Sequence, residues 1–143
     1  MGFSLNAFGS AATCARTIQF KRGYAIGDLA VRGIELYIDN LDVCGGSYET
    51  GLSKSSKLCT LNEYQWTSFI IDHKPATPTI DFYVNTGGGF PVFGSPTASI
   101  TTSANIPQAA DDAACYICLS ISKGAVATEC ALGLIDFWEI YPD

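Results

Sequence analysis

The chain has 143 residues and a formal charge of -6, and 48% of its residues are hydrophobic, 12% aromatic and only 15% charged. This length suits one domain, and the composition is too apolar for a disordered chain yet too often interrupted by polar residues for a membrane span. Because lysine and arginine are few and scattered, we expect no nucleic-acid partner and no acidic membrane surface as a partner. Because polar residues interrupt the apolar segments, we expect no membrane insertion.

Alternation of apolar and polar residues, rather than helical periodicity, runs along the chain and predicts strands. β-branched and aromatic residues are frequent in these segments, as is typical of pleated, half-buried surfaces. Clusters of glycine, proline and serine separate them, and no segment predicts a helix longer than one turn, at 107–114. The predicted strands are 15–21, 24–27, 33–39, 65–72, 79–85, 98–103, 115–122 and 132–141. We therefore expect an all-β fold.

Three short segments resemble one another: TIQF at 17–20, TIDF at 79–82 and LIDF at 134–137. Each has the character of the second strand of a hairpin, which predicts three related sheets of about 55 to 60 residues apiece. Three sheets packed about a common axis would bury their apolar faces together, as a triangular prism. The alternative is that the similarity is chance, because the pattern of an aliphatic residue, any residue and then phenylalanine is common in half-buried strands.

Six cysteines are many for a chain of this size. Their even number favours up to three disulfides in an oxidising compartment, although fifteen full pairings are possible. Buried free thiols are one alternative, and a zinc site at the Cys-x-x-Cys of Cys115 and Cys118 is another. A structural zinc site usually needs a second such pair or paired histidines, and His73 is the only histidine. We expect a secreted protein with disulfides and without metal, with a cytoplasmic location as the alternative.

Four segments, in this order along the chain, resemble the jacalin-related lectins: AIGDL at 25–29, LNEY at 61–64, TIDFYVNT at 79–86 and GLIDFWEIYP at 133–142. The resemblance spans nearly the whole chain. It implies a single jacalin-like lectin domain over residues 1–143, folded as a β-prism of three antiparallel sheets with pseudo-threefold symmetry. It also implies binding of glycans or glycoproteins without a cofactor. Because single sugar sites bind weakly, we expect a homo-oligomer that gains avidity.

In that family the sugar site forms where three loops meet at one end of the prism, and by resemblance these are 7–12, 72–77 and 123–136. Asp136 is the main candidate, because a carboxylate accepts from two adjacent hydroxyls and such bonds are about twice as strong as neutral ones. The family has a glycine four residues before this aspartate, whereas Gly133 stands three residues before it. The residues implied to bind carbohydrate are Asp136, Leu134, Gly133, His73, Lys74, Phe8 and Gly9. The alternatives are a strand-end aspartate at 136 and solvated side chains at 73 and 74.

An enzymatic role is not expected. Asp136 and Glu139 have an odd spacing, so on one strand they would point to opposite faces and would not act together across a glycosidic bond. The chain has no Gly-x-Ser-x-Gly and no phosphate-binding loop. The expected function is carbohydrate binding. The alternative is a structural or defensive extracellular β-prism protein without sugar binding, which the changed glycine spacing favours.

Overall fold

The computed structural model describes residues 2–4, 14–22, 33–39, 41–62, 65–74, 76–107, 115–123 and 134–135, and side chains within 33–38, 41–62, 65–74 and 76–107. These residues form strands and one short 3₁₀ helix, Ser103–Asn105. No helix in the described ranges is long and apolar enough to cross a bilayer. The strands are β1 (Gly2–Ser4), β2 (Cys14–Arg22), β3 (Gly33–Asp39), β4 (Asp42–Tyr48), β5 (Leu52–Thr60), β6 (Thr67–Lys74), β7 (Thr79–Asn85), β8 (Ala98–Ile100), β9 (Cys115–Lys123) and β10 (Leu134–Ile135).

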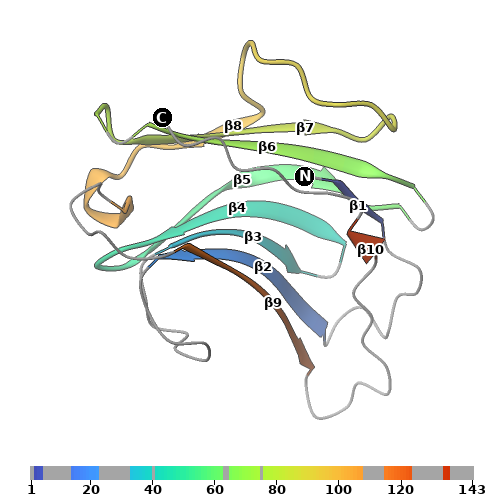
Figure 1. The fold of residues 1–143 in the computed structure, drawn as a ribbon, viewed down its shortest axis with the longest axis horizontal. Coiled ribbons are helices and arrows are strands. Elements are labelled where there is room, and N and C mark those ends of the chain that lie inside the picture. Colours follow the sequence, from blue (N-terminus) through green and yellow to red (C-terminus); the bar gives the residue numbers. More distant parts are fainter. Residues whose placement is uncertain are drawn as a thin grey trace.

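The described strands form two antiparallel sheets, which lie above one another in Figure 1. Sheet I has the order β10-β1-β6-β7-β8, and sheet II has the order β5-β4-β3-β2-β9. In sheet II the first four strands follow one another in sequence, and β9 returns from sheet I to pair with β2 along its whole length. A strand that returns to lie beside the first of a meander is the Greek-key arrangement.

The expected all-β fold with antiparallel strands is confirmed, but the expected three-sheet prism is not seen in the described part of the chain. Its strands form two sheets instead of three. The similar segments at 17–20 and 79–82 lie in β2 of sheet II and β7 of sheet I, while 134–135 forms β10, also in sheet I. These strands are therefore not equivalent members of three sheets. The apolar faces of two sheets suffice to cover each other, which removes the need for a third.

The hydrophobic core lies between the two sheets. Phe69 and Phe82 come from sheet I, and Leu36 and Ile38 come from sheet II; all four side chains are almost fully buried. Alternation along β7 turns residues 80 and 82 inward and residues 79, 81 and 83 outward. Other members of the same cluster are Val43, Leu58, Leu61, Ile80, Ala98, Ile100 and Ile106.

Gly45 in β4 is the point where sheet II makes room for a side chain of sheet I. A Cβ atom at this position would lie 2.3 Å from Cζ of Phe82, which is far closer than atoms can approach. The neighbouring Gly46 faces the other side of the strand, where the side chain of Glu35 lies over it. Both glycines are thus required by close neighbours, although glycine is otherwise unfavourable in a strand.

We predict that Gly45→Ala destabilises the protein by about 2 kcal/mol, because the added methyl group must displace a packed aromatic ring. The urea midpoint of unfolding would measure the loss. Gly94→Ala is the matched control: nothing lies within 4 Å of a Cβ atom at Gly94, so its free energy of unfolding should change by less than about 0.5 kcal/mol. Equal midpoints for the two variants would contradict the packing of Phe82 on Gly45.

The two cysteines whose side chains are described, Cys44 and Cys59, lie on neighbouring strands and are not in a disulfide, so the expected disulfides are not seen in this part of the chain. Burial raises the pKa of Cys59 to about 11, with further contributions from Asp42 and Cys44. Positions 115 and 118 both lie in β9, whose side chains are outside the described part of the chain.

We expect Cys59 to resist alkylation in the folded protein. With a pKa of about 11, its thiolate is about 0.1% of the population at pH 8, about two orders of magnitude below that of an ordinary thiol. Iodoacetamide labelling followed by peptide mass mapping would measure the rate, and the same protein in denaturant is the control. Rapid labelling of the folded protein, or a disulfide at Cys59 after non-reducing digestion, would contradict this prediction.

Candidate functional site

The residues expected to bind sugar do not all lie in the described part of the chain. Asp136, Gly133, Phe8 and Gly9 fall outside it. Leu134 lies in β10 and pairs with Ser4 of β1.

Leu134 is not close to the candidates from the middle of the chain. Phe3 of β1 pairs with both Ile135 and Thr67, so β10 lies beside the beginning of β6. Lys74 is at the other end of β6, about 24 Å from Thr67 at the usual rise per residue. The structure therefore does not bring Leu134 together with His73 and Lys74 in one site.

His73 and Lys74 belong to a strand, where a loop was expected. They are the last two residues of β6, and the chain turns only after them. Because successive strand residues face opposite sides, His73 lies on the core side with Phe69, and Lys74 lies on the outer face of sheet I. Of the two candidates, only Lys74 is thus presented on the outer face.

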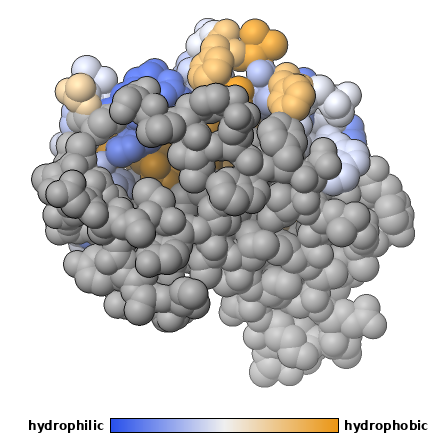
Figure 2. Space-filling view, in the orientation of Figure 1, coloured by the Kyte–Doolittle hydropathy of each residue, from blue (hydrophilic) through white to orange (hydrophobic). Residues whose placement is uncertain are grey.

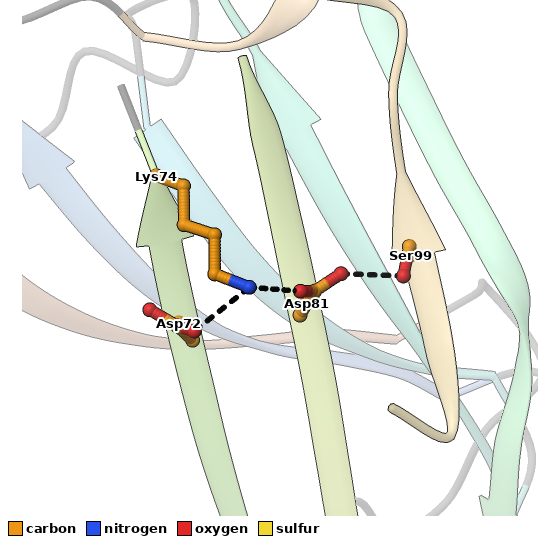
Figure 3. Close-up of polar contacts among 4 residues, drawn as sticks. All are labelled: Asp72, Lys74, Asp81 and Ser99. Carbon is orange, nitrogen blue, oxygen red and sulfur yellow. Dashed lines mark hydrogen bonds and ion pairs between the residues drawn. The ribbon is translucent and has the colours of Figure 1, made fainter. Parts of the chain in front are cut away.

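On this outer face Lys74 is the centre of a group of polar side chains from three adjacent strands, shown in Figure 3. Its Nζ atom lies 2.5 Å from Oδ2 of Asp81 and 3.2 Å from Oδ2 of Asp72. Ser99 donates a hydrogen bond of 2.5 Å from Oγ to the other oxygen of Asp81, Oδ1. We call these four residues the Lys74 cluster.

The pairing register of sheet I brings the cluster together. Asp81 of β7 pairs with Asp72 of β6 on one side and with Ser99 of β8 on the other, so the three side chains share one row on one face. Lys74 stands two residues beyond Asp72 on the same face, and its long side chain reaches back to both carboxylates.

The electrostatics of the cluster fix its charges. Burial by itself would raise the pKa of Asp81, but the hydrogen bonds from Lys74 and Ser99 outweigh it, and the pKa is lowered. The pKa of Lys74 is raised above its ordinary value, most strongly by the hydrogen bond to Asp81 and next by that to Asp72. Lys74 is therefore a cation and Asp81 an anion at neutral pH.

The members of the cluster differ in exposure. Only 10% of the Asp81 side chain is exposed, against 31% for Asp72 and 43% for Lys74. Asp81 thus holds the ammonium from below and is itself held by the exposed Ser99, while Asp72 and Lys74 are half-exposed. A strong acceptor and a strong donor lie side by side, an arrangement that suits a ligand with neighbouring hydroxyl groups.

Aromatic rings border the cluster along β7. Tyr83 follows Asp81 by two residues, so it lies on the same face about 7 Å away. The rings of Tyr83 and Phe93 pack edge to face, with their centroids 5.3 Å apart and their planes at 65°. Tyr83 is buried beneath this contact and Phe93 is exposed. The exposed ring of Phe93 is therefore linked to the polar cluster through Tyr83.

Sequence reasoning named Lys74 but missed Asp72, Asp81 and Ser99 as its partners. Asp81 was noticed only as part of a recurring segment. Alternation along a strand places residues 72 and 74 on the same face, so the sequence could have paired Asp72 with Lys74. The sequence does not show which strand lies beside this one, so Asp81 and Ser99 could not be found in this way.

Within the described ranges, no group of three or more histidine, cysteine, aspartate or glutamate side chains is arranged to hold a metal ion. Comparison of the chain with protein-family models, with curated proteins and with solved structures found no match. The similarity to jacalin-related lectins therefore stays a prediction from the sequence.

We predict that Lys74→Met lowers the free energy of unfolding, relative to the native protein, by more at neutral pH than at acid pH. In the native protein the lowered pKa of Asp81 means that its stabilising effect is present above the ordinary carboxyl value of about 3.9 and is lost as pH falls through the folded-state value. Without the lysine, burial dominates and the pKa of Asp81 rises. The difference between native protein and variant should therefore be largest near pH 7 and shrink on acidification.

Urea midpoints measured from neutral to acid pH would test this. Lys57→Met is the control, because Lys57 pairs with Asp42 at 3.5 Å on an exposed surface, where ion pairs contribute little. Its midpoint should follow that of the native protein throughout. A difference for Lys74→Met that does not change with pH would show that the charge of Asp81 is not coupled to Lys74.

Proposed function

We propose that the protein is a non-enzymatic carbohydrate-binding protein and that the Lys74 cluster, with Phe93 beside it, is a sugar site. One observation carries the proposal. The half-exposed carboxylate of Asp72 and ammonium of Lys74 lie 3.2 Å apart, and the nearly buried Asp81 holds the ammonium. Tyr83, the next outer-face residue of β7, packs against the exposed ring of Phe93.

Each group has a defined role in this proposal. The carboxylate of Asp72 accepts hydrogen bonds from sugar hydroxyls, and Lys74 donates to a hydroxyl or ring oxygen. The ring of Phe93 covers the apolar face of the sugar. Asp81 and Ser99 are positioning residues, because they fix the ammonium before the ligand arrives and so reduce the entropy lost on binding.

The fold gives support by analogy only. Two-sheet Greek-key sandwiches include lectin domains as well as proteins with other functions, so carbohydrate binding does not require a three-sheet prism. Secretion, binding of glycoproteins and homo-oligomerisation belong to the same proposal, on the strength of the sequence resemblance. The same resemblance makes Asp136, Gly133 and Leu134 the alternative location of the site. Shallow single sites of this kind bind with dissociation constants on the order of millimolar.

A structural role without sugar binding is the second candidate, and one observation favours it. The cluster satisfies much of its own hydrogen bonding: Lys74 contacts both carboxylates, and Ser99 donates a hydrogen bond to the other oxygen of Asp81. Rows of opposite charges across adjacent strands also stabilise sheets that bind nothing.

A glycan array followed by calorimetric titration would separate the two candidates. We expect Asp72→Asn and Phe93→Ala each to weaken sugar binding by about tenfold or more, because each removes a direct contact. Asp42→Asn is the control, since Asp42 also pairs with a lysine but lies in sheet II. Its affinity should be unchanged.

Absence of binding at millimolar sugar by a folded protein would exclude the lectin function and favour the structural role. The location of the site has its own test in Asp136→Asn. If that variant loses binding while Asp72→Asn retains it, the sugar site lies in the last loop of the chain and not at the Lys74 cluster.

A further inference from the structure

The loop between β7 and β8 carries an exposed apolar tip. Phe90 is 64% exposed, Val92 83% and Phe93 65%, and these are three of the five large hydrophobic side chains that are exposed in the described part of the chain. Figure 1 shows this loop rising away from sheet I, and Figure 2 shows hydrophobic atoms gathered at the same place, at the top of the view. We call these three residues the apolar tip.

The surroundings of the apolar tip are uncharged. The chain has no aspartate, glutamate, lysine, arginine or histidine between Asp81 and Asp111. The other exposed residues of the loop are glycine, serine and threonine, as at 87–89, 94–95 and 97. Charged groups are costly to bring into an apolar medium, and this loop has none to bring.

Hydrogen bonds fix both ends of the loop. At the first end, the side-chain oxygen of Asn85 accepts from the backbone N–H of Gly87 at 2.6 Å, and its side-chain nitrogen donates to the carbonyl of Phe90 at 3.2 Å. At the second end, the N–H of Thr97 donates to the carbonyl of Phe82 at 2.8 Å. The tip is therefore presented on an ordered base, which lowers the entropy cost of binding through it.

The shape and charge of the tip favour a lipid surface over a protein partner. Protein interfaces of ordinary size need broad complementary areas, whereas this tip is a narrow protrusion. An exposed tryptophan, Trp66, lies near the base of the loop. The preceding residue, Gln65, donates a hydrogen bond from Nε2 to the backbone carbonyl of Thr86, where the loop begins. Tryptophan is favoured where an apolar medium meets water. With a net charge of -6 and no basic residue in the loop, the surface in question is an uncharged one.

We propose that the apolar tip docks on the surface of a neutral, zwitterionic lipid bilayer, with Phe90 and Val92 entering the interfacial layer and the sheets remaining outside. No membrane insertion is expected from the sequence, and the proposal departs from that expectation only at the tip of this loop. Phe93 belongs to both proposed sites, but docking through Phe90 and Val92 needs no ligand at Asp72 or Lys74.

Sedimentation with phosphatidylcholine vesicles would test the proposal. We expect the native protein to bind these vesicles and Val92→Asp to bind at least about tenfold less, because a buried charge opposes entry. Leu52→Asp is the matched control: Leu52 is an exposed aliphatic residue in β5 of the other sheet, and its substitution should leave vesicle binding unchanged. Adding phosphatidylserine should not strengthen binding.

Three results would overturn the proposal: no binding to phosphatidylcholine, equal losses for Val92→Asp and Leu52→Asp, or binding only to anionic vesicles. A lipid-free dimer that Val92→Asp dissociates would also overturn it and assign the tip to a second copy of the chain. Asp72→Asn should bind vesicles like the native protein. Loss of sugar binding and loss of lipid binding would therefore be separate results, and failure of one proposal would not count against the other.

Discussion

The contact between Phe82 and Gly45 is the constraint on which the arrangement of the two sheets depends. It requires a residue without a side chain in β4 and fixes β7 with its even-numbered residues toward the core. A shift of β7 by one residue would turn Phe82 to solvent and Asp81 into the core, where an ionised carboxylate is costly. The position of Asp81 and Tyr83 on the outer face follows directly from the burial of their neighbours.

The Lys74 cluster shows how an outer face can acquire a fixed charge pattern. Asp81 loses solvent beside its neighbours, and the hydrogen bonds from Lys74 and Ser99 offset that loss well enough to lower its pKa. The same contacts keep the lysine protonated. Asp81, the one buried member, therefore holds the ammonium of Lys74 in place, and Asp72 and Lys74 are more exposed. The burial of one carboxylate is what separates the cluster from an ordinary surface ion pair.

Strands with clean alternation could be predicted from the sequence, and strands shaped by tertiary contacts could not. The segments 33–39 and 79–85 were predicted with the bounds that β3 and β7 have, and β2 and β9 differ from prediction by one residue at their ends. β4 was missed because its two glycines, required by Phe82 and Glu35, lower strand propensity. β5 was missed because it is rich in serine and lysine and its pairing with β4 shifts register twice. Alternation predicts which residues share a face but not which strands are neighbours, so it gave neither the two-sheet arrangement nor the partners of Lys74.

The outer face of sheet I changes character along its length, and Phe93 stands at the change. On one side lie the charged groups around Lys74, and on the other an uncharged loop with an apolar tip. The contact of Phe93 with Tyr83 joins them, since Tyr83 is the outer-face neighbour of Asp81. A sugar held by Asp72 and covered by Phe93 would therefore lie on the same side of the molecule as a bilayer touched by the tip. Together the two proposals point to glycans carried close to a lipid surface, where a second weak contact in the same direction would raise the effective affinity of a weak sugar site without any additional sugar contact.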